Sequence, residues 1–586
     1  MTTATATSLL AKGGAFLIED RAPDEIFTAE DLNDEHLAIA RTIDEFWTNE
    51  VEPNLEAIRQ QKPGVALKVL RKSAELGLTA INIPEQFGGM EMDFASVVVA
   101  SEHLAKDSSY GSWHSAHTGI GTLPVLFFGN EDQKQRYLPR LAKVELLAAY
   151  ALTEPLAGSD ALAARSRADL SPDGKSYILN GQKMWITNGG AADLFTVFAK
   201  VAGEKFTAFL VERSFPGVTS GAEEHKMGMK GSSTTAVYFD NVKVPVENVL
   251  GEVGRGHIIA FNILNIGRLK LGAGALGGAK KILGICLKYA QERKAFGSAI
   301  AQFGAIQHKL AEMAIRIFVV ESMLWRVVGL IEAQLQHSSQ EEPPVSACQL
   351  KAIEEYAAEC SMVKVYASEM LDYVVDEGVQ IHGGYGYHQD YAVETAYRDS
   401  RVNRIFEGTN EINRLLITGM LLKRTARGQL ALMPAIQAIL RRDISEPDLD
   451  EETRLVRNAK KVALLVLGIA HQEFGADLEN QQEVLMNISD IVMEVFAMES
   501  TLLRTRKLAA SGKAKNATYV CAVFLRDATD RLEVSSRSLI GTCSNDNARR
   551  DHMATLRAFV YYDPLDSISL RRKIASNLLA AGSYTA

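Results

Sequence analysis

A single carboxylate, Glu407, stands in a stretch whose composition suits acid–base chemistry. It follows the apolar pair Ile405-Phe406 and precedes a Gly408-Thr409 turn, after which an apolar pattern at helical spacing begins. An aromatic neighbour excludes water and raises a carboxylate's proton affinity, whereas the free N–H groups of a helix start favour its charged form. Glu407 is therefore a candidate base. The alternative is an ordinary first-turn glutamate before a helix capped by Thr409.

A second candidate region is the β-rich stretch 177–187. Asn180-Gly181 separates two strand-like runs in it and is typical of a two-residue hairpin turn. Trp185 and Thr187 are expected to share one face of the second strand, because strand side chains alternate. An indole beside a hydroxyl suits a flat ligand with polar edges. The alternative is an aromatic residue on the packed face of a sheet.

Changes in hydrophobic periodicity divide the chain into segments that must position these residues. We expect an N-terminal arm (1–33), a helical domain (34–147), an antiparallel β domain (148–256), a helical domain with the Glu407 loop (257–424) and an additional helical domain (425–586). The fold class is thus α+β and mainly α. Several glycines after residue 270 predict close packing of one helix against another: Gly272, Gly274, Gly277 and Gly278.

Composition narrows the class of protein. The 586 residues, 47% hydrophobic and 23% charged, are typical of a soluble globular protein with several domains. A net charge of -9 argues against nucleic acid as the main partner. The five cysteines lie far apart without histidines at ligand spacing, so we expect buried, reduced thiols and no metal site.

The N-terminus and the hydrophobic runs bear on location. The first residues lack the basic region of a signal peptide, and no run reaches the ~20 apolar residues of a membrane helix. We expect a cytoplasmic protein. Basic residues flank the apolar segment 430–440, which predicts either peripheral contact with a membrane surface or packing on the protein's own core.

Five motifs occur together and in order. They are YALTEPLAGSD at 150–160, KMWITNGG at 183–190, QERKAFG at 291–297, QIHGGYGY at 380–387 and RIFEGTNEI at 404–412. With them, residues 34–424 resemble the acyl-CoA dehydrogenase family of flavoproteins, and the full length looks most like its very-long-chain, C-terminally extended branch. The resemblance implies an N-terminal helical domain, a middle antiparallel β domain, a C-terminal four-helix domain and an extra helical domain.

The resemblance also implies FAD bound at a subunit interface. The motif positions that match the family's FAD contacts in one subunit are Tyr150, Leu152, Thr153, Gly158, Ser159, Trp185 and Thr187. Those that reach the neighbouring subunit's cofactor are Arg293, Phe296, Gln380, Gly383 and Gly384. Thr409 and Glu411 match the turn beside the adenosine portion of FAD. The positions assigned to the acyl-CoA channel are Ser159, Asn265, Arg268, Phe406 and Gly408.

Two positions differ among family members. The family commonly has an aspartate where Asn265 stands, and some members place their catalytic glutamate at the position of Gly267. Glycine has no side chain to act as a base, so Glu407 has no competitor there. Gly119 and Gly121 are expected to leave room for a long acyl tail, although the sequence leaves the chain length open.

The implied reaction is α,β-dehydrogenation of an acyl-CoA thioester to the trans-2-enoyl-CoA, the first step of fatty acid β-oxidation. Glu407 would remove the α proton while the β hydrogen leaves as hydride to flavin N5, and an electron-transfer flavoprotein would take the electrons from a homodimeric enzyme. Two alternatives stay open. One is an acyl-CoA oxidase that reduces oxygen, and the other is a non-catalytic assembly protein on the same fold.

Overall fold

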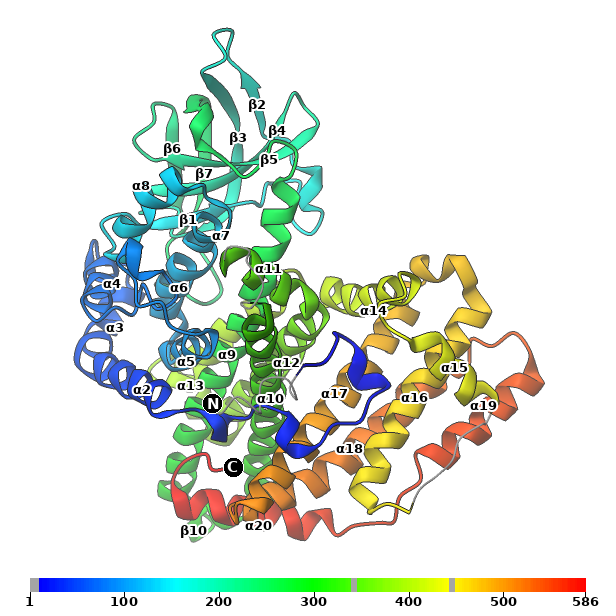
Figure 1. Cartoon of the computed structure of the whole chain (residues 1–586). Helices are drawn as coiled ribbons and strands as arrows, with labels where there is room; N and C mark the ends of the chain where they lie inside the picture. The colour runs from blue at the N-terminus through cyan, green and yellow to red at the C-terminus, as the bar shows by residue number, and fades with distance from the viewer. Residues whose placement is uncertain (1–9, 339–344, 442–447) are drawn as a thin grey trace.

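The computed structural model describes residues 10–338, 345–441 and 448–586. An N-terminal group of helices and a β domain lie on one side of a bundle of long central helices, and further helices extend on the other side (Figure 1). The N-terminal group comprises α2 (Asp34–Phe46), α3 (Leu55–Arg59), α4 (Val65–Glu75), α5 (Phe94–Leu104), α6 (Ser108–Ala116), α7 (Leu123–Phe128) and α8 (Glu131–Ala142). The mainly helical α+β class is confirmed.

The described residues of the β domain form an eight-stranded sheet with the order β6-β7-β3-β2-β4-β5-β8, and β1 pairs in parallel with β4. The other long pairings are antiparallel. The strands are β1 (Ala148–Ala151), β2 (Arg167–Leu170), β3 (Ser176–Thr187), β4 (Leu194–Val201), β5 (Lys205–Glu212), β6 (Val218–Glu223), β7 (Thr234–Pro245) and β8 (Val249–Leu250). The sheet has an apolar core of its own, which includes Phe195, Phe209 and Phe239.

The hairpin expected at Asn180-Gly181 is wrong, because residues 176–187 form one continuous strand, β3. Gly181 has φ +158°, which is extended backbone, and it marks a bulge against β7 where a Cβ atom would lie 2.2 Å from Ser166 Oγ. The turn before β3 instead contains Gly174 at φ +68°, whose N–H donates to Ser171 O at 2.9 Å. Asn-Gly occurs at bulges as well as turns, and periodicity alone does not separate the two.

Long helices form the centre of the molecule. They are α9 (Gly256–Glu292), α10 (Gly304–Ser338), α11 (Val345–Glu355), α12 (Ala357–His382), α13 (Ala392–Ser400) and α14 (Asn410–Ala426). A Cβ at Gly272 of α9 would lie 2.5 Å from Val363 of α12, and one at Gly277 would lie 2.0 Å from the carbonyl oxygen of Glu102. The close helix packing predicted from these glycines is confirmed.

The remaining helices form the C-terminal extension. They are α15 (Leu432–Arg441), α16 (Glu451–Phe474), α17 (Gln482–Ala510), α18 (Lys515–Ile540), α19 (Asp546–Phe559) and α20 (Ser567–Ala581). Leu432, Ile436 and Ile439 of α15 are buried, and Ile436 packs where α16 has Gly468. Of the two alternatives for segment 430–440, the structure shows the packed one.

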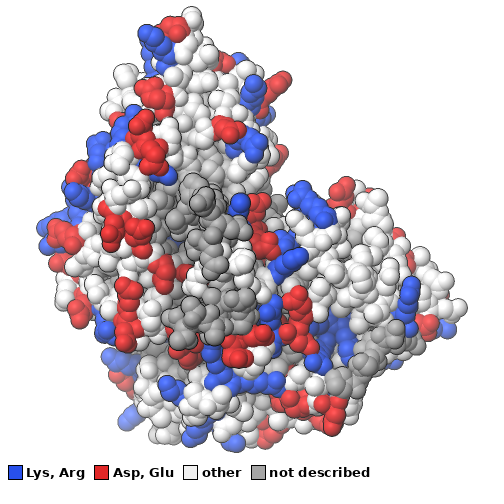
Figure 2. Space-filling view, viewed as in Figure 1, with Lys and Arg blue, Asp and Glu red and all other residues white. Residues whose placement is uncertain are grey.

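Surface and thiol chemistry agree with the composition. All five cysteines are buried and none forms a disulfide. Acidic and basic side chains are interspersed over the face shown in Figure 2. Within the described residues, we find no helix with the length and apolar character needed to cross a bilayer.

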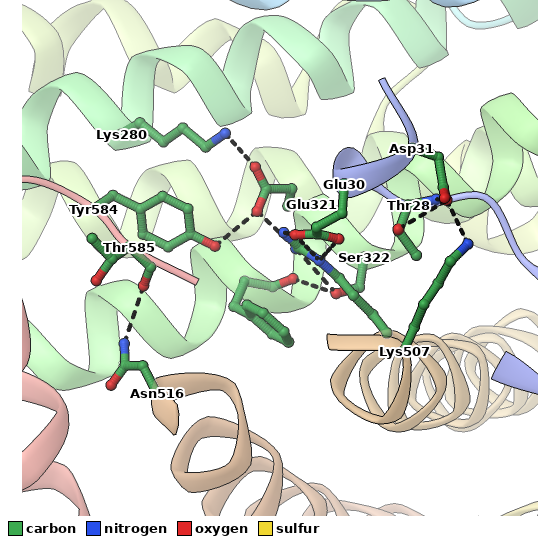
Figure 3. A network of polar contacts seen from close by, with 12 residues as sticks. Thr28, Glu30, Asp31, Lys280, Glu321, Ser322, Lys507, Asn516, Tyr584 and Thr585 are labelled. Atoms are coloured by element: carbon green, nitrogen blue, oxygen red, sulfur yellow. Dashed lines mark hydrogen bonds and ion pairs between the residues drawn. The ribbon is translucent and has the colours of Figure 1, made fainter. Parts of the chain in front are cut away.

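A buried ionic network joins the two chain termini to the central helices (Figure 3). Glu321 of α10 pairs with Lys280 of α9 and with Arg504 of α17, at 2.7 Å for the latter, and accepts a hydrogen bond of 2.8 Å from the hydroxyl of Tyr584. Arg504 also pairs with Glu30 of the N-terminal arm at 2.7 Å. Burial disfavours the charged carboxylate, but the two cations outweigh it and hold the pKa of Glu321 well below its usual range.

We expect Tyr584→Phe to lower the free energy of unfolding by about 2 kcal/mol, because hydrogen bonds to charged groups contribute roughly 1.5–3 kcal/mol. Tyr561→Phe removes an exposed hydroxyl that bonds only Asp563 in the described chain, so it should change stability by less than about 0.5 kcal/mol. Chemical denaturation of the two variants checks this difference. Equal denaturation midpoints for the two variants would show that the hydrogen bond from Tyr584 to Glu321 does not stabilise the packing of the helices.

Candidate active site

Glu407 lies in a tight turn between the short helix η12 (Arg401–Arg404) and α14. Glu407 and Gly408 both have left-handed backbone angles, with φ of +57° and +80°. Such a conformation is unusual for a glutamate and persists only where surrounding contacts impose it. Thr409 then caps α14, accepting a hydrogen bond from the N–H of Ile412 at 3.3 Å, so the predicted cap is confirmed.

Three side chains hold this turn through its carbonyl oxygens. Arg268 Nε donates to Glu407 O at 3.1 Å, while Lys364 Nζ and Asn413 Nδ2 each donate to Gly408 O at 2.8 Å. Arg268 Nη1 also donates to Asn265 Oδ1 at 2.8 Å. These contacts stabilise the left-handed conformation that aims the Glu407 side chain.

The structure therefore places Arg268 and Asn265, both buried, behind the loop and not in the wall of the cavity described below. Lys364 and Asn413 were missed in the sequence. A lone lysine in the apolar stretch 357–382 was the signal for Lys364. Nothing in the sequence around Asn413 predicts its role, because it stands one turn into an expected helix like any other polar residue.

The carboxylate of Glu407 occupies the space that a side chain at residue 267 would fill. An ideal Cβ on Gly267 would lie 2.7 Å from Glu407 Oε2. That oxygen is buried and accepts no hydrogen bond from the described part of the chain. Burial raises the pKa of Glu407 to about 7, and the positive charges of Arg268, Lys364 and Lys270 limit the rise. Glu407 is thus poised as a base near neutral pH.

This pKa predicts a pH dependence. A base acts only when deprotonated, so kcat/KM should fall as the pH drops through about 7 and level off above it. The limb should have unit slope, because one carboxylate titrates. Measuring kcat/KM between pH 5.5 and 9 tests this. A limb centred near pH 4.5 would show that Glu407 is not desolvated in the free enzyme.

Gly267→Ala tests whether the carboxylate needs this space. The added methyl group would displace Glu407, and a shift of ~1 Å in a catalytic group reduces rates by about 100-fold. We expect a comparable loss of kcat with an unchanged melting temperature. Gly284→Ala on the same helix is the matched control, since its Cβ would meet nothing within 4 Å. Full activity of Gly267→Ala would place the reactive carboxylate elsewhere.

A cavity of about 230 Å³ runs beside Glu407. Thr187, Phe406 and Glu407 line one end, and residues of α5, α6, α9, α12, α13 and the segment 78–82 line other parts of the wall. Gly119 lines the cavity as expected. Gly121 does not, because a Cβ there would lie 2.8 Å from the methyl group of Ala148, so this glycine serves packing.

Near this end, the loop 152–160 lies against β3. Met184 N–H donates to Thr153 O at 2.9 Å, and Lys183 Nζ donates to Leu152 O at 3.1 Å and pairs with Glu154 at 2.7 Å. The indole of Trp185 is 56% exposed on a backbone with φ +60°. Gly158 faces open space and Ser159 is exposed, so these residues border an accessible surface. Tyr150 is buried beneath it, against Phe198.

The remaining predicted cofactor residues lie elsewhere on the chain. Phe296 is 97% exposed at the tip of a hairpin between β9 (Lys294–Ala295) and β10 (Ser298–Ala299). The guanidinium of Arg293 lies 5.4 Å from the ring centre of Tyr385, close to Gly383 and Gly384 in η11 (Gly383–Tyr387). Gln380 is exposed nearby on α12, whereas Thr409 and Glu411 stay at the start of α14.

These two groups are far apart within one chain. Gly267, beside the Glu407 carboxylate, and Arg293 are separated by 26 residues along α9 and its end, which is roughly 39 Å at 1.5 Å per residue. The strand β3, which carries Trp185, and the β9–β10 hairpin lie at opposite ends of the molecule (Figure 1), so Arg293 and Phe296 do not meet Trp185 in a single copy. They form a separate exposed surface with open glycines.

Four family models match this chain. They describe the acyl-CoA dehydrogenase N-terminal domain at residues 33–145, the middle domain at 149–242, a C-terminal domain at 254–422 and a further acyl-CoA dehydrogenase C-terminal domain at 458–558. A probable acyl-CoA dehydrogenase of Bacillus subtilis is 44% identical over 584 residues, covering 98% of both chains. The chain belongs to the acyl-CoA dehydrogenase family and is an oxidoreductase.

Other relatives define its branch. The very long-chain specific mitochondrial acyl-CoA dehydrogenase of Homo sapiens is 36% identical over 79% of this chain and 74% of its own. A Bacillus anthracis acyl-CoA dehydrogenase complexed with FAD superposes with a TM-score of 0.96 at 45% identity over 98% of this chain and 100% of its own. Butyryl-CoA dehydrogenase of Megasphaera elsdenii covers only 67% of this chain, with 99% of its own, at 33% identity and a TM-score of 0.60. The present chain is thus an extended member of the family.

Proposed function

We propose that this protein uses FAD to dehydrogenate long-chain acyl-CoA thioesters to trans-2-enoyl-CoA, as the first step of fatty acid β-oxidation. The observation that carries the proposal is the buried carboxylate of Glu407, held at the end of the cavity with a pKa of about 7. The family membership supplies the class of reaction.

Glu407 would take the α proton of the thioester. An enolate-like charge then develops on the thioester oxygen and must be stabilised. The Glu407 turn is held rigid by Arg268, Lys364 and Asn413, so its geometry is set before the substrate binds. The burial of the Glu407 carboxylate excludes water, which brings the proton affinity of Glu407 nearer to that of the substrate. Bound FAD supplies the acceptor for the hydride that leaves the β carbon.

The residues present fit FAD. Gly158, Gly383 and Gly384 face open space, which permits close approach of a phosphate-bearing ligand to the backbone, and Trp185 offers an exposed ring. Because Arg293 and Phe296 lie far from Trp185 in one chain, we propose that a second copy supplies them and that the enzyme is a homodimer. Thr409 and Glu411 would lie beside the adenosine portion.

The length of the cavity favours a long acyl chain. Residues of α9 line it from Gly267 to Ile282, a span of 15 residues or roughly 22.5 Å. Small residues, including Gly274 and Gly278, keep it open along the helix. We expect the rate to increase from short to long saturated chains.

The electron acceptor and location are also proposals. We propose an electron-transfer flavoprotein as acceptor and the cytoplasm as the compartment. The exposed edge around Trp185 is the surface on which an acceptor would dock.

Anaerobic mixing of the purified holoenzyme with acyl-CoAs of increasing length tests the function. We expect the flavin absorbance to bleach within seconds with long chains and the colour to return slowly in air. Rapid recolouring by oxygen would identify an oxidase. A holoenzyme that no acyl-CoA bleaches would favour a non-catalytic assembly role.

A further inference from the structure

Lys270 of α9 places an ammonium group in the wall of the acyl cavity. It lies one helical turn beyond Gly267, hence roughly 4.5 Å farther along the cavity from Glu407. Its Nζ atom lies 3.2 Å from where a Cβ of Gly119 would stand and donates to Thr118 Oγ1 at 3.2 Å. Gly119 therefore makes room for the lysine as well as for the ligand.

Lys364, another enclosed lysine, donates to two neutral oxygens, Gly408 O at 2.8 Å and Asn410 Oδ1 at 2.7 Å. Three further enclosed lysines of the described chain have carboxylate partners. Lys183 pairs with Glu154 at 2.7 Å, Lys280 with Glu102 at 2.6 Å and Lys460 with Glu499 at 2.5 Å. Lys270 forms no such ion pair with the described residues, and its hydrogen-bond partner among them is the hydroxyl of Thr118. Burial lowers the pKa of Lys270 to about 8, although the negative charge of Glu407 acts to raise it.

An alkyl chain cannot accept a hydrogen bond from the ammonium group of Lys270. When a saturated acyl tail fills the cavity, water leaves and the ammonium keeps only Thr118 as a close partner. Burying a polar or charged group without a partner is costly, and a site with an unsatisfied donor discriminates against ligands that cannot accept a hydrogen bond. Lys270 therefore interacts more favourably with a ligand that carries a hydrogen-bond acceptor than with a hydrocarbon chain.

We propose that Lys270 is a specificity-determining residue that selects acyl-CoA substrates bearing an oxygen acceptor, such as a hydroxyl, oxo or carboxylate group, a few carbons beyond the reacting pair. The oxygen would accept a hydrogen bond from Nζ alongside Thr118. This inference rests on the proposed dehydrogenase function and narrows its substrate class.

Matched substrates test the inference. Acyl-CoAs of one chain length are compared, either unsubstituted or with a hydroxyl or a terminal carboxylate stepped outward along the chain. We expect kcat/KM to be about 10- to 100-fold higher for the best-placed oxygen than for the unsubstituted chain, since a hydrogen bond to a charged donor has that effect. The hydroxyl and carboxylate series show whether the acceptor is neutral or charged.

Lys270→Met removes the charge at nearly constant length. It should abolish the preference and improve kcat/KM for unsubstituted chains, while the exposed Lys175→Met control keeps the wild-type pattern. The pH dependence of kcat/KM shows whether Lys270 sets the substrate specificity or instead shifts the pKa of Glu407. Equal rates for oxygenated and unsubstituted chains, with Lys270→Met shifting only the pKa of Glu407, would overturn the proposal. Failure of every acyl-CoA to bleach the flavin would instead reject the dehydrogenase function.

Discussion

Glu407→Gln is expected to reduce the rate of flavin reduction by at least about 10³-fold, because a general base contributes roughly 10²–10⁴-fold. The other two carboxylates that line the described cavity, Asp107 and Asp399, already accept hydrogen bonds from Arg59, Ser109 and Met229. Glutamine has nearly the same shape. The left-handed turn is held through carbonyl oxygens of the backbone, which the substitution leaves in place. The variant should therefore keep FAD and bind acyl-CoA. Stopped-flow absorbance gives the rate, and titration of the flavin spectrum gives binding.

Glu479→Gln provides the control, because Glu479 is exposed in the C-terminal extension. It should reduce flavin at the wild-type rate. If Glu407→Gln retained more than about a tenth of wild-type turnover, another group would have to remove the α proton. Loss of FAD together with turnover would instead indicate that Glu407 supports the cofactor site.

Lys183→Met should be the most destabilising single change that we predict. Lys183 is fully buried, and Glu154, its partner at 2.7 Å, also accepts hydrogen bonds from Arg165 N–H at 2.6 Å and Ser166 N–H at 3.0 Å. Without the lysine, Glu154 stays buried as an unpaired charge, which costs about 3–5 kcal/mol. The loop 152–160 would also detach from β3, so FAD affinity should fall. Thermal unfolding and FAD release measure the two effects.

Two further variants test whether the unpaired charge of Glu154 causes the loss of stability in Lys183→Met. Lys175→Met changes an exposed lysine at the turn before β3 and should alter stability by less than about 0.5 kcal/mol. Lys183→Met combined with Glu154→Gln leaves no unpaired charge and should recover part of the loss. If the double variant were no more stable than Lys183→Met, lost packing and not the stranded carboxylate would explain the effect.

Part of the site followed from local sequence. The turn before α14, its Thr409 cap and the candidate base depend on neighbouring residue types, and local backbone chemistry decides such features. Helical periodicity likewise predicted the helical domains, and the glycines of α9 predicted close packing. The resemblance of five motifs then led to the family, which the comparisons confirmed.

Other features depended on which side chains meet across the fold. Asn180-Gly181 has hairpin chemistry, yet pairing with β7 on one side and β2 on the other made it a bulge in a continuous strand. Gly119 and Gly121 are two residues apart, but only one faces the cavity. A dipeptide cannot reveal which neighbours are available to it.

The sequence by itself determined the family, the helical domains and the identity of the candidate base, because motifs and periodicity are properties of short segments. Only the tertiary structure decided that the Glu407 carboxylate lies in the space left by Gly267, that Arg268, Lys364 and Asn413 hold its loop, and that Lys270 lines the acyl cavity. Apart from Asn413, which is 6 positions from Glu407, these residues are 43 to 140 positions from Glu407 in the chain. Burial, and hence the pKa and partners of a charged group, is set by such distant contacts and not by neighbours in sequence.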